Sequence, residues 1–273
     1  MTLRRLDAEL TRRGLARSRD HARELVAAGV VHVRGNVARK VATNVSDADP
    51  IMVVDSGPAW VSRGAHKLIG ALDAWPQIDV SGRPALDAGA STGGFTQVLL
   101  SRGALGVIAV DVGYGQLAWS LRMDDRVHVL DRVNIRSLAP EALPWTPSVI
   151  VADLSFISLT TVLPALASVC APGGDMLLMV KPQFEVGREA VGSGVVREPL
   201  LRCGAVNRVA QAARDQGLRI HGIEPSPLPG PSGNVEYFLW LSTPDGLPRE
   251  RPESLAGAVL LSSIEAAVDR GPT

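Results

Sequence analysis

The stretch of sequence that decides the fold is Asp87-Ala88-Gly89-Ala90-Ser91-Thr92-Gly93-Gly94-Phe95. It lies between an apolar run over 84–88, typical of a buried strand, and a helical pattern over 95–102. Glycine at such a junction lets the backbone approach a ligand closely. The loop is not a dinucleotide fingerprint, because Ala90-Ser91 breaks the required G-x-G-x-x-G spacing.

Strand-like and helical runs alternate on the C-terminal side of this loop. Apolar runs such as Val149-Ile150-Val151 imply burial on both faces, which is typical of a parallel sheet covered by helices. We therefore expect an α/β fold of the Rossmann-like class, with a mostly parallel sheet of seven strands. The predicted strands are 84–88, 107–112, 127–130, 148–152, 176–180, 219–223 and 235–241, and the clearest helices are 95–102, 159–169, 200–216 and 253–268.

The first part of the chain follows a different pattern. Two short helices, the second beginning at Ser18, precede an alternation that starts at Val31-His32-Val33 and ends at Ile51-Met52-Val53-Val54. This pattern predicts a small α+β domain. We expect that domain over 1–56, a linker with a helix around 66–72 over 57–83, and the α/β domain over 84–273.

The charge of the chain is unevenly distributed. Residues 1–67 hold 12 Lys and Arg against 7 Asp and Glu, whereas the remaining residues hold 16 against 21. A basic segment on a mildly acidic body indicates a polyanionic partner, and arginine binds phosphate oxygens through its forked donors. The alternative is an ordinary solvated basic surface. The arginines expected to contact this polyanion are Arg5, Arg12, Arg13, Arg17, Arg19, Arg23 and Arg63.

The glycine-rich loop has the D-x-G-x-x-x-G form associated with S-adenosylmethionine. Asp111 ends the second predicted strand, where a carboxylate accepts hydrogen bonds from ribose hydroxyls. Asp131 ends the third strand and is expected to reach the adenine amino group. Another bound nucleotide remains the alternative. The expected cofactor-binding residues are Asp87, Gly89, Ala90, Ser91, Thr92, Gly93, Asp111 and Asp131.

Three polar residues, Asp153, Lys181 and Glu236, are expected at the carboxyl edge of the sheet, where ligands of open α/β sheets bind. Glu236 lies there if the last strand runs antiparallel. Two acids and a lysine suit an alcohol nucleophile such as a ribose 2′-hydroxyl, which must lose its proton. A lysine acts as a base only when burial or a nearby cation lowers its pKa, and Lys67 is the expected cation. Alone, each residue reads as a surface lysine or a salt-bridged acid.

The sequence also resembles known families. Arg5-Leu6-Asp7, Gly14 to Arg19 and Ala27 to Gly35 resemble the S4 RNA-binding domain. The whole chain is similar to the TlyA (haemolysin A) family of ribosomal RNA methyltransferases, whose catalytic domain resembles the FtsJ 2′-O-methyltransferases. The stretches that carry this resemblance are Ser62 to Leu68, Asp87 to Phe95, Asp111 to Gly115, Asp153 to Ser158 and Lys181 to Phe184.

The family resemblance implies a catalytic tetrad and a reaction. The tetrad is Lys67, Asp153, Lys181 and Glu236. The implied reaction moves a methyl group from S-adenosylmethionine to the 2′-oxygen of cytidine in the RNA of the small ribosomal subunit, the large subunit, or both. One departure is Pro58 in Pro58-Ala59-Trp60-Val61, where related sequences carry arginine, and this proline would stiffen the linker.

Other features bound the function. The two cysteines, Cys170 and Cys203, are expected to be reduced thiols, and no metal site is expected. The start of the chain lacks an apolar leader, and the uncharged run 154–174 is interrupted by Pro164, so we expect a cytoplasmic protein without stable membrane association. A loop over 185–197 is a predicted lid, and the target nucleotide is expected to flip out. The rivals are a non-catalytic ribosome-assembly factor, a haemolysin-like membrane-active protein and an S4-domain pseudouridine synthase.

Overall fold

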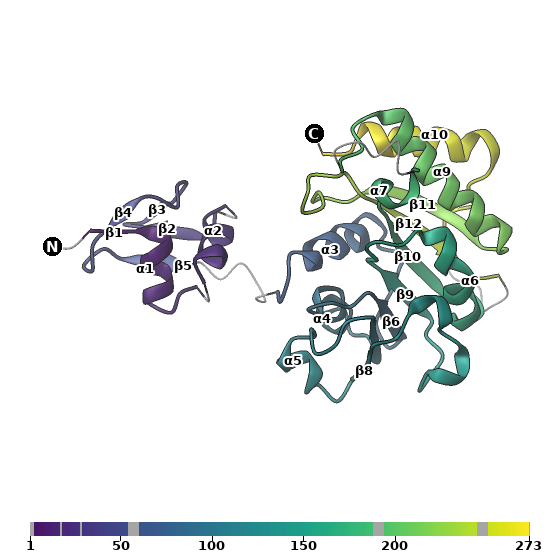
Figure 1. Cartoon of the computed structure of the whole chain (residues 1–273), viewed down its shortest axis with the longest axis horizontal. Helices are drawn as coiled ribbons and strands as arrows, with labels where there is room; N and C mark the ends of the chain where they lie inside the picture. Colours follow the sequence, from purple (N-terminus) through teal and green to yellow (C-terminus); the bar gives the residue numbers. More distant parts are fainter. Residues whose placement is uncertain are drawn as a thin grey trace. The chain divides into compact units, whose positions relative to one another are not determined.

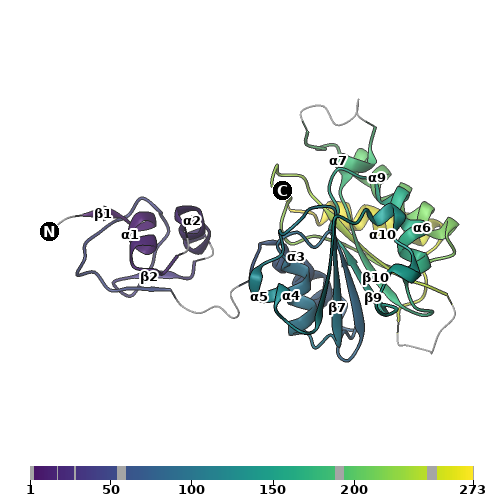
Figure 2. The same ribbon diagram turned by 60° about the horizontal axis from the view of Figure 1, so that its bottom comes forward.

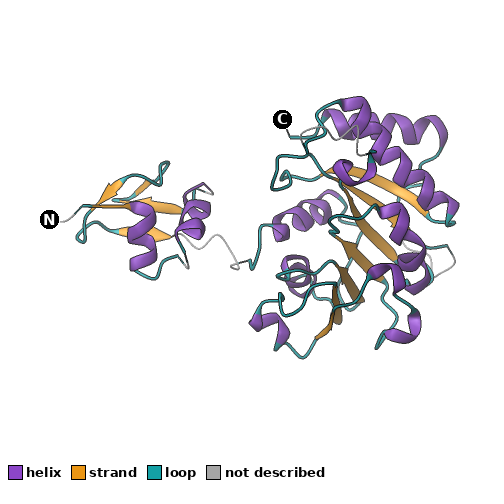
Figure 3. Cartoon of the chain, viewed as in Figure 1, coloured by secondary structure: helices purple, strands orange, loops and turns teal. Residues whose placement is uncertain are grey.

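The chain folds into two compact units, Met1–Ala59 and Trp60–Thr273. The computed structural model describes residues 3–16, 18–27, 29–53, 60–187, 194–244 and 251–272. Figure 1 shows the two units with their labelled elements, and Figure 3 colours the same view by secondary structure.

The smaller unit packs two helices on two short sheets. The Ser18 hydroxyl accepts a hydrogen bond from the His21 amide and caps the second helix. Strands β1 and β4 form one antiparallel pair, and the order of the other sheet is β3-β2-β5. Buried leucine, valine and alanine side chains fill the space between them. The elements are β1 (Arg4–Arg5), α1 (Leu6–Arg12), α2 (Arg19–Ala27), β2 (Val31–Val33), β3 (Asn36–Val37), β4 (Asn44–Val45) and β5 (Ile51–Val53).

The larger unit is built on a seven-stranded sheet with the order β11-β12-β10-β9-β6-β7-β8. Strand β12 is antiparallel to both of its neighbours, and β10, β9, β6, β7 and β8 pair in parallel. The strands are β6 (Pro84–Ala88), β7 (Gly106–Asp111), β8 (Val127–Asp131), β9 (Val149–Ala152), β10 (Asp175–Val180), β11 (Arg219–Pro225) and β12 (Tyr237–Ser242).

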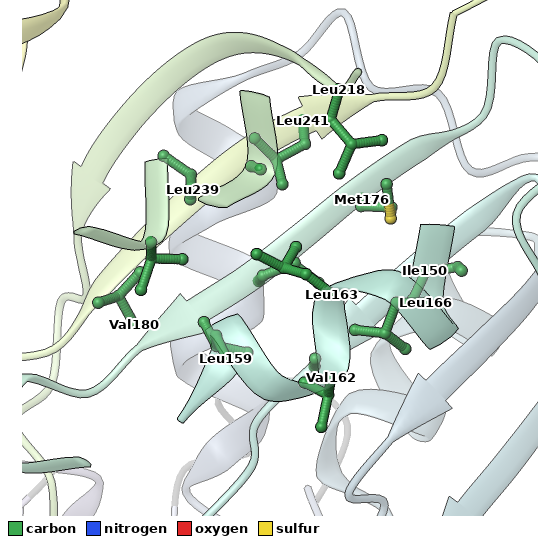
Figure 4. Packing of buried hydrophobic residues seen from close by; sticks show 14 of the residues in the cluster. Ile150, Leu159, Val162, Leu163, Leu166, Met176, Val180, Leu218, Leu239 and Leu241 are labelled. Atoms are coloured by element: carbon green, nitrogen blue, oxygen red, sulfur yellow. The ribbon is translucent and has the colours of Figure 1, made fainter. Parts of the chain in front are cut away.

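Helices cover both faces of this sheet (Figure 2). Alternate residues of each central strand face opposite layers: Ile150 packs in the layer with α6, α9 and α10, whereas Val151 packs in the layer with α3 and α4. Figure 4 shows the first layer, where Leu163 of α6 lies close to the sheet. The helical elements are α3 (Gly64–Ala74), α4 (Gly94–Ser101), α5 (Trp119–Arg122), η1 (Ile135–Ser137), η2 (Pro140–Ala142), α6 (Leu159–Val169), α7 (Pro182–Glu185), α9 (Pro199–Asp215) and α10 (Gly257–Asp269).

The predicted α/β class and the seven-stranded sheet are confirmed. Most predicted ends of strands and helices lie within two residues of the observed ones, and two of the differences lie near the end of the chain. The last strand begins at Tyr237 and not at Val235, so Glu236 lies just before it, and the last helix begins at Gly257. Single-turn elements such as α5 and α7 were not predicted, because four residues do not show a helical period. No helix in the described parts of the chain is long and apolar enough to cross a membrane.

The contribution of the α6 layer can be measured at Leu163, whose side chain is fully buried. We expect Leu163→Ala to lower the free energy of unfolding by about 2–5 kcal/mol, because the substitution leaves a cavity in a close-packed layer. Urea denaturation measures the change. Leu200→Ala is the matched control, since the Leu200 side chain is 84% exposed and loses little on truncation. Equal effects of the two substitutions would contradict this packing.

Candidate active site

Lys67 and Glu236, which are far apart in the sequence, form a buried ion pair. Lys67 lies on α3, and its Nζ is 2.5 Å from Glu236 Oε2. The same amine is 4.0 Å from the Met179 sulfur on β10. Lys67 is 7% exposed and Glu236 1% exposed, so water screens this pair little. Helix α3 therefore places the charged group of Lys67 at the end of the sheet where Glu236 precedes β12.

A second ion pair joins two neighbouring strands. Lys181, just after β10, holds its Nζ 2.6 Å from Asp153 Oδ1, and Asp153 follows β9 directly. The amine also donates a hydrogen bond to Ser155 Oγ at 3.0 Å. These two contacts fix the direction of the Lys181 side chain. Ser155 was not singled out from the sequence, although its place two residues after Asp153 was a usable signal.

Strand register explains why the two pairs lie at one edge. Strands β10 and β12 pair antiparallel up to Val180 and Tyr237, so one further step brings Lys181 opposite Glu236. Strands β9 and β10 run parallel, so the residues that follow them, Asp153 and Lys181, leave the sheet on the same side. The structure thus brings together all four predicted tetrad residues in two pairs. One pair is Lys67 with Glu236, and the other is Lys181 with Asp153.

Both basic residues of these pairs are lysines, although lysine is rare in this chain. Only three of the 28 basic residues are lysines, namely Lys40, Lys67 and Lys181. Two of the three are buried at this edge. An amine can give up its proton, whereas a guanidinium stays charged at all relevant pH values. Buried ion pairs are weak sources of stability, so this arrangement favours chemistry over structure.

The glycine-rich loop follows β6 beside these pairs. Gly89 has a φ of +83°, and a Cβ there would lie 2.7 Å from the Asp153 carbonyl oxygen. Another residue would therefore push apart the glycine-rich loop and the loop that carries Asp153. Gly93 also has a positive φ, and leucine side chains occupy the space of its missing Cβ. The Gly93 amide donates a hydrogen bond to the Ala90 carbonyl oxygen at 2.7 Å, and the Ala118 amide donates to the Thr92 carbonyl oxygen at 3.1 Å. These contacts give the loop a fixed shape at the predicted cofactor site.

Two predicted cofactor carboxylates end neighbouring strands, as expected. Asp111 accepts backbone hydrogen bonds from Ser91 at 2.8 Å and from Gly113 at 2.7 Å. It therefore ties the glycine-rich loop to the end of β7. Asp131 forms an ion pair with Arg122, whose Nη2 is 2.7 Å from Asp131 Oδ2. The predicted contact of Asp131 with adenine must therefore share this carboxylate with Arg122.

Asp87 is fully buried inside β6. Thr96 donates a hydrogen bond to Oδ2 at 2.7 Å, whereas Oδ1 has no hydrogen-bond partner among the described residues. Burial raises the pKa of the Asp87 carboxyl from its usual 3.8 to about 7, with Thr96 opposing the rise and the charges of Asp153 and Asp111 adding to it. An unpartnered buried acid fits a cationic ligand. The residues present therefore suit S-adenosylmethionine, which carries sulfonium and ammonium charges.

Backbone strain is concentrated at the same edge. Four described non-glycine residues have positive φ, and three of them, Ser91, Arg132 and Phe156, lie in loops that follow β6, β8 and β9. Phe156 is 91% exposed and lies 5.4 Å from the Phe184 ring, centroid to centroid. An exposed aromatic side chain beside Ser155 is available to a substrate. Phe156 was not singled out from the sequence, although it lies inside the stretch Asp153 to Ser158.

In the smaller unit, two fully buried carboxylates on α1, Asp7 and Glu9, organise the predicted RNA-binding arginines. Hydrogen bonds from two arginines lower the pKa of Glu9 to about 2. The carboxylates thus hold guanidinium groups in fixed places. The ion pairs are Arg5 and Arg19 with Asp7, and Arg12 and Arg13 with Glu9.

The arginines divide into two groups by exposure. The Arg13 side chain is only 21% exposed and donates to the carbonyl oxygens of Ser46 and Asp49, so it serves the fold. Arg23 is 56% exposed and pairs with Asp20 on the surface of α2. The side chains of Arg5, Arg12 and Arg19 are also about half exposed. Arg63 is exposed next to the start of α3 in the larger unit.

Several predicted features lie outside the described residues. These are Arg17, the linker residue Pro58 and positions 188–193 of the predicted lid. Of the two ends of that predicted lid, Glu185 is buried and Arg197 is exposed. Within the described ranges, no group of three or more His, Cys, Asp or Glu side chains is arranged to hold a metal ion.

Comparison with known proteins gives consistent matches. A family model of FtsJ-like methyltransferases matches residues 60–243, and an S4 domain model matches residues 4–51. The 16S/23S rRNA (cytidine-2'-O)-methyltransferase TlyA of Mycobacterium tuberculosis strain H37Rv is 56% identical, and the match covers 98% of each chain. The putative rRNA methyltransferase YqxC of Bacillus subtilis is 40% identical, over 88% of this chain and 86% of its own length. A solved structure of a putative hemolysin from Streptococcus thermophilus has a TM-score of 0.73 at 37% identity, over 99% of this chain and 96% of its own.

The raised pKa of Asp87 predicts how stability depends on pH. Between about pH 4 and pH 7 the folded chain holds this proton more tightly than the unfolded chain does. The free energy of unfolding therefore falls as the pH rises through this window, by up to about 4 kcal/mol for this group. Asp87→Asn removes the titration, so its stability relative to the wild type should increase from pH 4 to pH 7. Urea denaturation across this range tests this, with exposed Asp125→Asn as the control. A constant difference between Asp87→Asn and the wild type would refute it.

Proposed function

Because the chain belongs to the TlyA family of ribosomal RNA methyltransferases, we propose that it transfers a methyl group from S-adenosylmethionine to the ribose 2′-hydroxyl of a cytidine in ribosomal RNA. The observation that carries the proposal is the meeting of two lysine–carboxylate pairs, one buried and one partly exposed, beside the glycine-rich loop. The expected substrate is the RNA of one or both ribosomal subunits, which places the activity in the cytoplasm.

S-adenosylmethionine supplies an electrophilic methyl group on a sulfonium. The glycine-rich loop and the carboxylate of Asp111 would hold it, because Asp111 already fixes Ser91 and Gly113 at the end of β7. A bound cation would favour the ionised form of Asp87, whose Oδ1 has no hydrogen-bond partner among the described residues. These residues bind and orient, and none of them needs to exchange protons with the RNA.

Lys181 is the proposed general base. Asp153 and Ser155 hold its amine at 2.6 and 3.0 Å, so the amine occupies one position. Once it has lost its own proton, this amine would accept the proton of the 2′-hydroxyl as the oxygen attacks the methyl group. Asp153 would then stabilise the ammonium that forms, as a carboxylate does for the general base in other transfer reactions.

Lys67 and Glu236 are the proposed pair that orients the ribose. Glu236 Oε2 accepts a hydrogen bond from Lys67, while Oε1 is buried and has no hydrogen-bond partner in the described part of the chain. A buried unpaired carboxylate oxygen is costly, so a substrate hydroxyl that pairs with it gains free energy. We assign Oε1 to a hydroxyl of the target ribose. Exposed Phe156 is the proposed stacking surface for a flipped-out base.

The base assignment is tested by Lys181→Ala. We expect the rate of methyl transfer to fall about 10²–10⁴-fold, the usual contribution of a general base, with RNA binding retained. The measurement is transfer of label from S-adenosylmethionine to ribosomal subunits that lack the modification, followed by detection of 2′-O-methylcytidine. Arg214→Ala, on an exposed turn of α9, is the control. Tight RNA binding by a wild type that transfers no label would favour a ribosome-assembly factor instead.

The division of the arginines gives a second test. Arg23→Ala should weaken RNA binding and reduce the slope of log K against log salt by about 0.7–0.9, the loss of one phosphate contact, without lowering stability. Arg13→Ala should instead destabilise the smaller unit, because Ser46 and Asp49 carbonyl oxygens lose their donor. Binding titrations at several salt concentrations and thermal unfolding separate the two effects. Reversed effects of the two substitutions would show that the arginines are wrongly divided.

A further inference from the structure

The loop between β11 and β12, residues 226–236, is closed by its own backbone; we call it the Glu236 loop. The Ser226 amide donates to the Glu236 carbonyl oxygen at 2.8 Å. Further along, the Gly230 amide donates to the Asn234 carbonyl oxygen at 2.9 Å, and the Gly233 amide donates to the Gly230 carbonyl oxygen at 2.9 Å. Three backbone hydrogen bonds thus define the path that presents the Glu236 side chain.

Gly230 makes room for the Glu236 carboxylate. A Cβ at this position would lie 2.6 Å from Glu236 Oε1 and 3.2 Å from its Cδ, while the next atom, the Asn234 carbonyl oxygen, is at an ordinary 3.7 Å. Gly230 is not among the glycines with positive φ, so its backbone would accept alanine. The absence of a side chain therefore serves the carboxylate and not the turn.

Asn234 fastens the loop to a distant segment. Its side chain is buried, and its two ends bind backbone atoms of opposite polarity. Oδ1 accepts from the Val196 amide at 2.9 Å, and Nδ2 donates to the Gly194 carbonyl oxygen at 2.8 Å. Aspartate has the same shape but cannot donate, so it would leave the Gly194 oxygen against a buried negative charge.

The loop also rests on the helix that carries Lys67. A Cβ at Gly70 of α3 would lie 2.6 Å from Pro227 Cγ, which shows how closely the helix and the loop approach. Gly70 follows Lys67 by three residues and so lies near it on the helix surface. Both partners of the Lys67–Glu236 pair therefore belong to elements in direct contact.

We propose that Gly230 and Asn234 are positioning residues for the methyl transfer: they hold the Glu236 carboxylate against Lys67 without touching the substrate. The proposal rests on the proposed function only for its effect on rate. Its structural part, the placement of the ion pair, stands independently. A displacement on the order of 1 Å in a reacting constellation lowers rates by about 10²-fold.

The three lysines give a direct readout. The full-length chain is prepared with isotope-labelled lysine, and the side-chain NMR signals of Lys40, Lys67 and Lys181 are assigned by single Lys→Arg variants. We compare Gly230→Ala and Asn234→Asp with matched controls on exposed positions of α9. These controls are Gly204→Ala, where a Cβ meets open space, and Asn207→Asp.

The expected result is a shifted Lys67 signal in both loop variants, an unchanged Lys40 signal, and unchanged Lys67 signals in both controls. Methyl transfer to ribosomal subunits should fall about 10²-fold in kcat while KM for the subunits stays unchanged, as expected for misplaced but present groups. Thermal unfolding of each variant shows whether it is folded. If Asn234→Asp does not fold, Gly230→Ala decides, because Glu236 is the group its methyl meets.

A Lys67 signal that is unmoved in folded Gly230→Ala overturns the positioning role. Unchanged transfer in that variant overturns it as well. A wild type that transfers no methyl group overturns the proposed function instead, and the NMR comparison then still decides whether Gly230 and Asn234 place the ion pair.

Discussion

Strand β12 is antiparallel to β10, and this single reversal supplies the site with its fourth charged residue. In a fully parallel sheet, the start of a strand lies at the edge opposite the ligand. Because β12 enters from the carboxyl edge, Glu236 arrives beside Lys181. The loop before β12 then reaches α3, where Gly70 meets Pro227. The placement of Glu236 beside Lys181 and the path of the Glu236 loop both depend on the direction of this one strand.

Much of the larger unit could be predicted from sequence because its strands are buried on both faces. The apolar strand at 149–152 is typical of burial on both faces, and Asp153, which follows it directly, was therefore expected at the ligand edge. The partners within the site could not be read in the same way. Lys67 lies on a helix outside the repeating strand–helix pattern, and its pairing with Glu236 joins residues that are 169 positions apart. Such a contact depends on tertiary packing, which no local pattern records.

In the smaller unit, the number of charged residues predicts a basic segment but not the role of each arginine. A basic segment was predicted from composition, but composition does not distinguish an arginine that binds RNA from one that satisfies a buried acid. Asp7 and Glu9 are buried among the arginines of α1 and α2, and Arg13 donates hydrogen bonds to backbone carbonyl oxygens. The two-residue strand β1 was not predicted, because alternation needs more residues than it contains. Strand β4 lies within the predicted alternation.

The scarcity of lysine has a consequence for chemical modification. Lys40 is exposed, whereas the amines of Lys67 and Lys181 are buried and paired with carboxylates. Acylating reagents attack free, neutral amines that solvent can reach. A reagent of this kind would therefore label the smaller unit at Lys40 and spare both site lysines in the folded chain. Because all but three of the 28 lysines and arginines are arginines, lysine acylation would change the surface charge of the protein little.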